Sequence, residues 1–242
     1  MSASYTTHVL DASHPQSQHL VLKSATLRLA GLLQSPDSFS STYDEEVSLT
    51  DAEKSEMLWR PKRTTIVVAQ AEDKNDDWTQ ADWAGQVTLL GPFTREEYLA
   101  PYLDTHEGSQ RLSIAELNTT FEPVSPDDSS AVYWHMTALY VLNDHRRRGL
   151  GDQLCRKAFE VIRERGTGAG SELRIVIKPD NGIVARMYER LGFEPRGGKS
   201  TLAEAIVASE GSAALPLDYA HREGFFKRNG IIMVKRQGAN KE

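Results

Sequence analysis

Apolar residues recur along the chain in short runs whose spacing predicts the secondary structure. Leucines repeat at helical spacing over residues 25–33, so we expect a helix there that Ser24 caps and that ends near Gln34. The apolar pieces at 8–10 and 20–22 are typical of a first strand entering a compact domain. This pattern predicts a chain that begins with a strand followed by a helix.

Two β-branched, apolar stretches at 64–71 and 83–90 predict a pair of strands, and the polar residues 73–82 between them predict a hairpin loop. Before these strands, Thr50 is followed three residues later by Glu53. This capping-box pattern predicts the start of a short helix, because each side chain can bond the other residue's backbone amide.

Residues 93–130 are less regular than the rest of the chain. Thr94 and Glu97 offer another capping box, Pro101 is expected to interrupt the helix that follows, and a polar stretch comes next. We interpret this segment as an insertion or a mobile flap.

The second half of the chain alternates between strand and helix patterns. Strands are expected at 133–142, 173–178 and 230–236, and helices at 150–165, 181–191 and 200–211. Gly166 and Gly192 follow the first two of these helices, as glycine often does where a helix ends. The alternation indicates a mixed α/β fold class.

Composition narrows the class of protein. With 242 residues, 39% of them apolar and 26% charged, the chain is typical of a soluble globular protein. Cys155 is the single cysteine, which excludes an intramolecular disulfide or a cysteine-based zinc site and fits a reducing, cytoplasmic compartment. We expect it to be packed and inert, and the scattered histidines predict no metal site. The N-terminus, MSASYTTHVL, predicts neither a signal peptide nor a membrane span.

Charge is unevenly distributed along the chain. The net charge of −6 argues against a nucleic-acid binder that relies on global positive charge. Residues 1–144 carry a net −13 and residues 145–242 a net +7. An anionic cofactor on the basic part and a cationic substrate on the acidic part would suit this division, although solvated surface charge explains it as well.

The most informative stretch, 139–151, combines a strand, a turn and the start of a helix. Its turn contains Arg146, Arg147, Arg148, Gly149 and Gly151. Glycine lets the backbone approach a phosphate, the first helical amides lack acceptors, and arginines add charge-assisted hydrogen bonds. The loop therefore suits a pyrophosphate. It lacks the Lys-Ser/Thr of a Walker loop, and Leu154 replaces the third glycine of a dinucleotide fingerprint.

This loop resembles the Q/R-x-x-G-x-G/A motif of the GNAT superfamily of acyl-CoA-dependent N-acetyltransferases, as Arg146-x-x-Gly149-x-Gly151. About thirty residues later, Asn181, Tyr188 and the pair Gly192-Phe193 resemble the family's second motif. The resemblance is specific over 133–193 and diffuse over 25–92.

The resemblance implies a GNAT-like fold: a mixed, mostly antiparallel twisted sheet flanked by helices and split between strands 4 and 5. We expect a single domain over 1–242, with its best-supported core at 133–193 and insertions near 93–130 and 194–229.

The family's cofactor is acetyl-CoA, and the resemblance implies which residues bind it. The backbone amides of Arg147, Arg148, Gly149, Leu150 and Gly151 would cradle the pyrophosphate, with Arg146 at the start of the loop. The main chain of Leu139, Tyr140 and Val141 would pair with the pantetheine arm, and Asn181 and Tyr188 would close the acyl-CoA site. Since the family often has glycine at position 147, the Arg147 side chain must point outward.

Two residues are candidates for catalysis. Tyr188 matches the family tyrosine near the thioester sulfur and would donate a proton to the departing thiolate; an ordinary buried helix position is the alternative. His135 stands where several members have a glutamate base, and a histidine is a competent base at neutral pH. A core histidine is the alternative there, with Tyr133, Glu45, Glu46 or a water chain acting as the base.

The expected reaction is direct acetyl transfer to a primary amine, most simply of a small molecule. An aromatic and acidic wall for a cationic acceptor is expected from Phe39, Tyr43, Asp44, Glu45 and Glu46, although these residues also fit a solvated loop. Two alternatives stay open: a protein N-terminal or lysine acetyltransferase, and an acyl-CoA-binding regulatory module without turnover. We expect a monomer or homodimer with no nucleic-acid or membrane partner.

Overall fold

The computed structural model describes residues 4–36, 39, 41–71, 77–103, 114–122, 124, 131–166 and 170–238. Seven strands form one sheet in the order β1-β2-β3-β4-β5-β7-β6. The chain divides into two compact units: unit 1 comprises Met1–Leu89 and Ala138–Val161, and unit 2 comprises Leu90–Thr137 and Ile162–Glu242. Each unit is described by itself. No helix among the described residues is long and apolar enough to cross a membrane.

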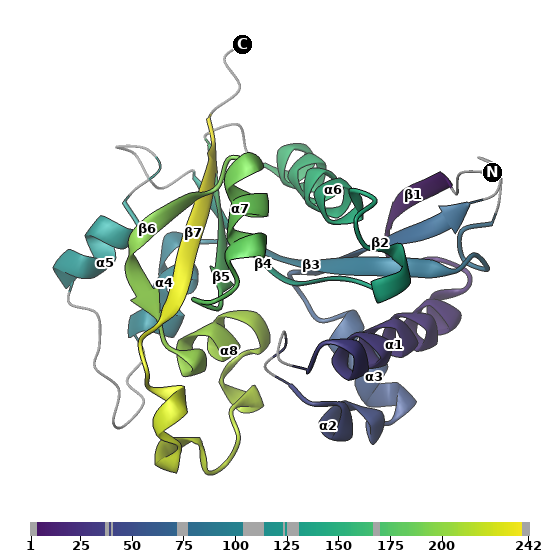
Figure 1. Cartoon of the computed structure of the whole chain (residues 1–242), viewed down its shortest axis with the longest axis horizontal. Helices are drawn as coiled ribbons and strands as arrows, with labels where there is room; N and C mark the ends of the chain where they lie inside the picture. Colours follow the sequence, from purple (N-terminus) through teal and green to yellow (C-terminus); the bar gives the residue numbers. More distant parts are fainter. Residues whose placement is uncertain are drawn as a thin grey trace. The chain divides into compact units, whose positions relative to one another are not determined.

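In unit 1, three complete helices and most of a fourth helix pack with the strands. Its elements are β1 (Ser4–Val9), α1 (Ser17–Gln34), α2 (Tyr43–Val47), α3 (Asp51–Leu58), β2 (Arg63–Ala71), most of β3 (Trp83–Phe93), the end of β4 (Val132–Val141) and most of α6 (Leu150–Arg165). β1 pairs with β2 in antiparallel register, from Ser4 opposite Ala71 to Val9 opposite Ile66. α1 lies beside α2 and α3 (Figure 1). Leu20, Val21 and Leu27 of α1 pack with Leu58 and Val67 in the core of this unit.

Unit 2 surrounds the start of β4 and the following strands. It contains α4 (Arg95–Leu103), α5 (Ile114–Thr120), β5 (Ser171–Ile177), α7 (Gly182–Arg190), β6 (Glu194–Ser200), α8 (Leu202–Glu210) and β7 (Gly230–Gln237). β4 pairs in parallel with β5 from Val132–Ser171 to His135–Arg174, and β7 is antiparallel to β5 and to β6. The register of β4 with β5 covers only the first four residues of β4, as expected for strands that part farther along.

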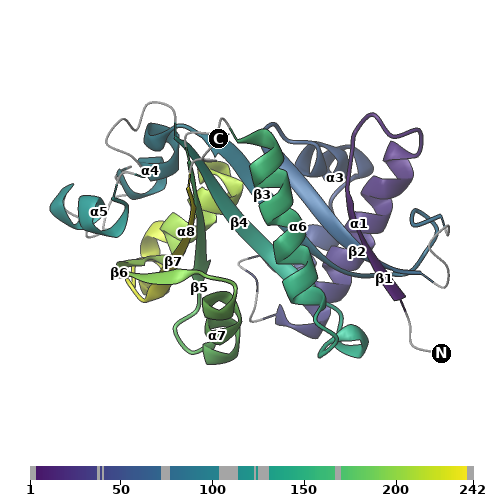
Figure 2. The same cartoon turned by 90° about the horizontal axis from the view of Figure 1, so that it is seen from above.

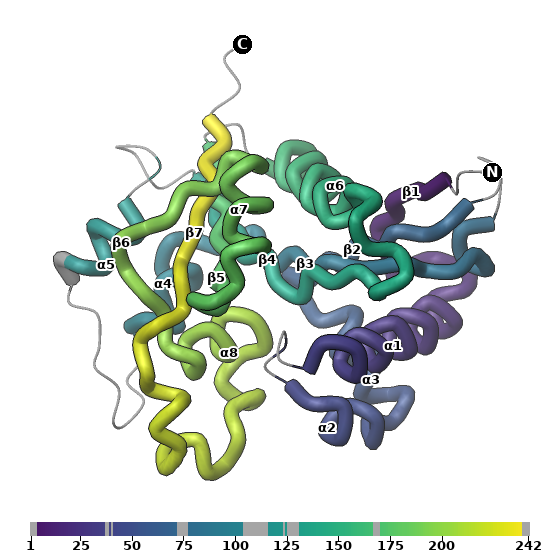
Figure 3. Tube along the Cα trace, in the orientation of Figure 1, coloured from purple at the N-terminus to yellow at the C-terminus, as the bar shows by residue number. Residues whose placement is uncertain are grey.

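The helices of unit 2 lie close to these strands. α5 lies beside β6 (Figure 2), and α4 contacts α8. The path of the chain from β6 through α8 to β7 can be followed in Figure 3. The core of the unit contains Tyr98, Tyr102, Phe121, Tyr133 and Ile232.

Most of the expected elements are present. The strands expected at 64–71, 83–90, 133–142, 173–178 and 230–236 are β2 to β5 and β7, and the helices expected at 150–165, 181–191 and 200–211 are α6, α7 and α8. Both capping boxes form: the Oγ1 of Thr50 accepts from the amide of Glu53, and the Oγ1 of Thr94 accepts from the amide of Glu97. The mixed α/β class is confirmed.

The expected start of the first helix is wrong. α1 begins at Ser17, and Ser24 is a buried residue inside it, with its Oγ 3.4 Å from the Oε1 of Gln86. The apolar piece 20–22, expected in a strand, belongs to this helix, where Leu20 and Val21 are buried. The first turn of α1 is exposed and polar, so its residues lack the apolar repeat by which a helix is predicted from a sequence.

Two further expectations need correction in unit 2. Pro101 lies inside α4 and is buried there, so it does not interrupt the helix, which ends two residues later at Leu103. β6 was not expected at all. Its sequence, EPRGGKS, is polar and contains a proline and two glycines, and its pairing with β7 shifts register between Pro195 and Lys199. Such an irregular strand leaves no alternating pattern in the sequence.

The segment expected to be an insertion or flap is only partly described. Its described part forms α4 and α5, and Tyr98, Tyr102 and Phe121 anchor it in the core of unit 2. Residues 104–113, 123 and 125–130 lie outside the described residues. The same holds for 73–76 of the expected hairpin loop.

Candidate active site

The glycine- and arginine-rich loop of unit 1 connects β4 to α6 through a short 3₁₀ turn at Asn143–His145. Arg147 and Gly149 both have left-handed backbone, with φ of +61° and +76°. A Cβ added to Gly149 would meet nothing within 4 Å, so the backbone there is open to a ligand. The amide of Gln153 bonds the carbonyl of Gly149 at 3.1 Å, which makes it the first intrahelical donor of α6.

The amides that precede this first donor include those of Leu150, Gly151 and Asp152, which have no acceptor within the helix by its geometry. Together with the positive end of the helix dipole, they form an anion-binding surface. The side chains of Arg147 and Arg148 are exposed beside it. The loop therefore fits the pyrophosphate expected from the sequence.

Arg146 is held against the protein. Its Nε donates to the carbonyl of Val141 at 2.9 Å, an Nη donates to the Oγ of Ser35 at 2.9 Å, and its guanidinium lies over the Tyr140 ring at 5.6 Å. These contacts attach the start of the loop to the end of β4 and the end of α1. Arg146 therefore positions the loop.

A second set of contacts fixes the loop from β1. An Nη of Arg148 donates to the hydroxyl of Tyr5 at 3.2 Å, and this hydroxyl also lies 2.9 Å from the Nδ1 of His145. The Tyr5 and His145 rings meet edge to face, with centroids 5.8 Å apart. Contacts with the end of β4 and with β1 therefore both hold the loop in place.

The end of β4 presents its residues alternately. The Tyr140 ring is buried against Phe39, with centroids 5.6 Å apart, and its hydroxyl donates to the Oε1 of Gln34 at 2.8 Å. Burial raises the pKa of the Tyr140 hydroxyl, which keeps it neutral. Leu139 and Val141 are half-buried and point to the other face of the strand. Ala138 has a φ of +51°, so β4 bends just before these residues.

In unit 2, Asn181 and Tyr188 belong to α7. The Oδ1 of Asn181 accepts from the amide of Val184 at 3.3 Å, so this asparagine caps the helix. The Tyr188 ring is buried and meets the Phe193 ring edge to face, with centroids 5.2 Å apart. Gly192, with a φ of +84°, turns the chain so that Phe193 reaches back to Tyr188. The Gly-Phe pair therefore positions the tyrosine.

His135 is buried in unit 2, with an exposed fraction of only 2%. Its Nδ1 accepts from the Nε of Arg174 at 3.3 Å, so the proton is assigned to Nε2, which lies 3.0 Å from the Oγ of Ser209. The Ser209 hydroxyl donates in turn to the Oγ1 of Thr137 at 3.3 Å. Burial and the Arg174 charge hold the pKa of His135 well below its usual value. His135 is therefore a neutral imidazole whose two nitrogens both make hydrogen bonds. Its role as a base stays a prediction.

A buried polar cluster around Arg174 escaped the sequence reasoning. Arg174 is 1% exposed, and its guanidinium lies 4.1 Å from the Tyr98 ring centroid and donates to the Tyr98 carbonyl at 2.8 Å. Glu172 is fully buried between the Nε of Arg236 at 3.0 Å and the hydroxyl of Tyr98 at 3.2 Å. The available signal was a pair of opposite charges two residues apart in an otherwise apolar strand, SELRIVI.

The expected acceptor wall of unit 1 lies around α2. Glu46 is buried, and its two carboxylate oxygens accept from the Nε and an Nη of Arg28, each at 2.6 Å. Glu45 forms the capping box of α2 with Thr42. Phe39 lies beneath the Arg28 guanidinium and Tyr43 is half-buried. Both carboxylates therefore have structural partners, and substrate binding by Phe39, Tyr43, Glu45 and Glu46 stays a prediction.

Cys155 is fully buried, and burial raises the pKa of its thiol to about 12. A thiol that keeps its proton is a poor nucleophile, so Cys155 is a packing residue as expected. Within the described residues, no group of three or more His, Cys, Asp or Glu side chains could hold a metal ion.

Residues 93–193 match the family model described as acetyltransferase (GNAT) family. Residues 93–193 are therefore similar to GNAT-family acetyltransferases. The matched range includes the arginine- and glycine-rich loop, Asn181, Tyr188 and the Gly-Phe pair, which confirms the family that these motifs indicate. Acetyl-CoA is the acyl donor of this family, so the expected cofactor and N-acetyltransferase class are confirmed with it.

Solved structures show the same fold at low sequence identity. NAA60 of Arabidopsis thaliana in complex with a bisubstrate analogue is 11% identical with a TM-score of 0.52, covering 97% of this chain and 100% of that one. An acetyltransferase of the GNAT family from Streptococcus pneumoniae is 14% identical with a TM-score of 0.50, at 97% and 100% coverage. A putative acetyltransferase from Acinetobacter baylyi is 9% identical with a TM-score of 0.52, at 98% and 94% coverage. No curated protein sequence matches the chain significantly.

Proposed function

We propose that this GNAT domain transfers the acetyl group of acetyl-CoA directly to the primary amine of a small molecule. The observation that carries the proposal is the loop between β4 and α6, where the open backbone at Gly149 and the first amides of the helix form an anion site. A pyrophosphate needs several converging donors, and the amides from Arg147 to Gly151 supply them.

The donor brings the activated acetyl group as a thioester. In this proposal, the main chain at Leu139, Tyr140 and Val141 binds the pantetheine arm as an added strand does. The bend at Ala138 supports this role, because a strand that leaves its regular path exposes backbone groups that its neighbour no longer uses. The same groups would polarise the acetyl carbonyl, which typically contributes about 3 kcal/mol per donor.

Tyr188 is the proposed general acid. Transfer forms the new amide bond and breaks the bond from carbon to sulfur, so the departing thiolate must gain a proton. A phenol with a usual pKa of about 10 keeps its proton at neutral pH and can donate it as negative charge develops on the sulfur. The transfer to a thiol that titrates near 8.5 is uphill by about 2 kcal/mol, and the phenol afterwards regains a proton from solvent. The contact with Phe193 fixes the Tyr188 ring and supports a defined position for its hydroxyl.

His135 is the proposed base, acting through its hydrogen-bonded neighbours. The chain from His135 through Ser209 to Thr137 leads from the buried imidazole to a half-buried hydroxyl on β4. For the amine to lose a proton along this chain, the two hydrogen bonds from His135 to Ser209 and from Ser209 to Thr137 must reverse. The imidazole must then carry its own proton on Nδ1 so that Nε2 can accept, which breaks the hydrogen bond from Arg174. The Arg174 charge opposes the protonated imidazole, so the proton would pass on to solvent quickly.

A small acceptor is favoured by the connection between β6 and β7. α8 in this connection buries Ala203, Ile206 and Ala208, and Ser209 at its end bonds both His135 and Thr137 of β4. Through Ser209, this helix reaches His135 and Thr137 on β4, and in this proposal it leaves no room for an extended peptide beside them. The helix thus supports a small amine over a protein N-terminus or lysine.

Calorimetric titration with acetyl-CoA, followed by an assay of CoA release with a panel of amines and peptides, tests the proposal. We expect binding, and turnover of a small amine with a kcat/KM at least tenfold above that of any peptide. A preference for peptides would identify a protein acetyltransferase. Binding without turnover of any acceptor would identify a regulatory module.

A matched pair of glycine variants tests the loop itself. Gly149 and Gly211 both have a positive φ with nothing within 4 Å of an added Cβ, so Gly149→Ala and Gly211→Ala each impose backbone strain of about 1 kcal/mol or more without a steric clash. We expect only Gly149→Ala to weaken acetyl-CoA binding, by about tenfold. Equal affinities in the two variants would contradict the assigned phosphate site.

A further inference from the structure

The last turn of α1 packs against the end of β4 within unit 1. Gly31 is buried in this turn, and a Cβ added to it would lie 3.0 Å from the Cδ1 of the Tyr140 ring and 3.2 Å from the Cζ of Phe39. Glycine therefore lets the helix backbone approach the Tyr140 ring closely, where a larger residue would displace it. Gln34, the last residue of the helix, follows three positions later and so projects from the same side.

Gln34 contacts two successive parts of the expected cofactor site through one atom. Its Oε1 accepts from the hydroxyl of Tyr140 at 2.8 Å and from the backbone amide of Asn143 at 2.9 Å. Tyr140 belongs to the stretch of β4 proposed to bind the pantetheine arm. Asn143 begins the short turn that leads to the amides proposed to bind the pyrophosphate. The two lone pairs of one carbonyl oxygen thus join these two parts of the site.

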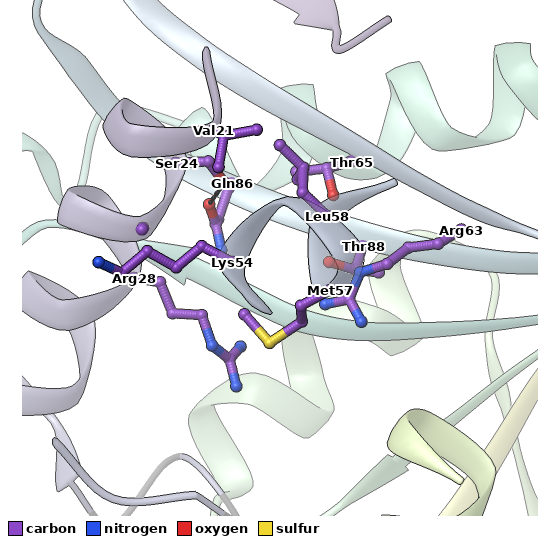
Figure 4. A pocket seen from close by; sticks show the side chains of 11 residues that line it. Val21, Ser24, Arg28, Lys54, Met57, Leu58, Arg63, Thr65, Gln86 and Thr88 are labelled. Atoms are coloured by element: carbon purple, nitrogen blue, oxygen red, sulfur yellow. Dashed lines mark hydrogen bonds between the residues drawn. The ribbon is translucent and has the colours of Figure 1, made fainter. Parts of the chain in front are cut away.

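α1 can hold both partners because the helix is itself fixed on the sheet. Val21 and Leu27 are buried in the core of unit 1. The Oγ of Ser24 lies 3.4 Å from the Oε1 of Gln86 in β3, the strand next to β4, beside a small cavity (Figure 4). Since α1 is one continuous helix, its last turn cannot shift without disturbing these contacts.

A site built mainly from backbone groups depends on such support. In the proposed site, the main chain at 139–141 and the amides at 147–151 must face one ligand together. If the end of β4 and the loop moved separately, only a fraction of the molecules would have the spacing that acetyl-CoA needs. The apparent affinity would then fall by that fraction.

We infer that Gln34 is a positioning residue for acetyl-CoA: its Oε1 holds the end of β4 and the start of the loop at the spacing that the cofactor needs. The amide of Asn143 and the hydroxyl of Tyr140 are both engaged by Gln34, so Gln34 acts through the backbone that these partners hold. The inference rests on the proposed function for the place of the cofactor, and it concerns binding rather than transfer.

Two glutamine variants of the same helix test the inference. Gln34→Met removes the strong acceptor and keeps a long side chain of high helix propensity. Gln18→Met is the matched control, because Gln18 is exposed in the first turn of α1, about 24 Å along the helix axis from Gln34. In calorimetric titration with acetyl-CoA, we expect Gln34→Met to raise the Kd about tenfold and Gln18→Met to change it less than twofold. Equal Kd values in the two variants would overturn the inference.

A double-mutant cycle shows whether the contact with Tyr140 is responsible. We expect Tyr140→Phe, which removes only the hydroxyl, to raise the Kd about threefold. The double variant should lose no more than Gln34→Met alone, because both substitutions remove the same hydrogen bond. A loss of about thirtyfold, the product of the two single effects, would show that the side chains act separately and would overturn the inference. Circular dichroism and the binding stoichiometry confirm that each variant is folded.

Kinetics separate positioning of the cofactor from a general loss of structure. Gln34→Met should raise the KM for acetyl-CoA by about the same factor as the Kd and leave kcat within twofold, because Gln34 is not proposed to contact the reacting atoms. A lowered kcat with an unchanged KM would overturn the inference. If the wild type binds acetyl-CoA but acetylates no amine, the proposed transfer fails, and the calorimetric comparison still decides the role of Gln34. If the wild type does not bind acetyl-CoA, both fail.

Discussion

Arg174 donates its Nε hydrogen to the Nδ1 of His135 at 3.3 Å, and both side chains are buried. The arrangement places a permanent cation beside an imidazole in the interior of unit 2. Because a protonated imidazole would face a like charge without solvent, the histidine stays neutral. The Arg174 charge is balanced in turn by the aromatic rings around it and by the Tyr98 carbonyl.

This pair predicts how stability depends on pH. The folded pKa of His135 lies below its unfolded value, so the unfolded chain takes up a proton that the folded chain refuses. The stability that depends on a neutral His135 is fully present above the unfolded pKa of about 6.5. It is lost as the pH falls below that value, by at most about 1.4 kcal/mol per pH unit. Urea unfolding at pH 7 and pH 5 should show a smaller loss for His135→Gln than for the wild type. An identical loss in both proteins would contradict the assigned pKa shift.

The same shift constrains catalysis. If His135 is the base, activity falls only when the pH drops through its lowered pKa, so the acid limb due to His135 lies below about 6.5. A profile of kcat/KM against pH for wild type and His135→Gln checks this. An acid limb above pH 6.5 that persists in the variant would identify another group, such as the acceptor amine, as the one that titrates.

Removing the cation should change both the fold and the histidine. In Arg174→Met, the Nδ1 of His135 and the Tyr98 carbonyl each lose their donor, so we expect a loss of about 3 kcal/mol in the free energy of unfolding. The pKa of His135 should rise, because the like charge is gone. An NMR titration of the imidazole measures this rise, and a constant pKa would show that burial alone determines it.

Tyr188→Phe tests the general acid. The phenyl ring retains the packing against Phe193, so stability and acetyl-CoA affinity should change little. Loss of the proton donor should lower kcat by about a hundredfold or more. Steady-state kinetics and calorimetry separate the two effects. An unchanged kcat would leave Tyr188 as a packing residue only.

Glu46→Gln tests the acceptor wall. Since the Glu46 carboxylate accepts two hydrogen bonds from the buried Arg28, we expect this substitution to destabilise the protein by about 3 kcal/mol. A residue that served only to bind the acceptor would instead raise the KM for the amine and leave the unfolding midpoint unchanged. Urea unfolding together with acceptor kinetics distinguishes these outcomes.

Arg147 offers a test of backbone strain in the loop between β4 and α6. Its φ of +61° favours glycine, so Arg147→Gly should be about 1 kcal/mol more stable than Arg147→Ala, which keeps the strain. Thermal unfolding of the two variants gives the difference. The comparison excludes the effect of the lost charge, because both variants lack the arginine.

The sequence predicted the elements whose pattern is strong. α6 has the expected bounds, Leu150–Arg165, because it is strongly amphipathic and glycines flank it. The capping boxes at Thr50 and Thr94 were found because the motif is local. β6 could not be found, since a polar strand that contains glycines and a proline owes its form to pairing with β7. The start of α1 was misplaced because its first turn is exposed and polar.

The candidate site was predictable in part for a similar reason. The loop between β4 and α6 depends on backbone conformation, which glycines reveal in a sequence. The surroundings of His135 depend on Arg174 and Ser209, which are 39 and 74 residues away along the chain. The pairing of Glu46 with Arg28 is equally non-local: Glu46, one residue of the expected acceptor wall, also holds α2 against α1.

The restraint of Arg146 has an energetic consequence for ligand capture. Its guanidinium is fixed by the Val141 carbonyl, the Ser35 hydroxyl and the Tyr140 ring before any ligand arrives. An arginine carries about 2 kcal/mol of rotamer entropy, and here that entropy is lost during folding. The loop can therefore present one ordered positive charge to an incoming pyrophosphate without immobilising a flexible side chain at the moment of binding.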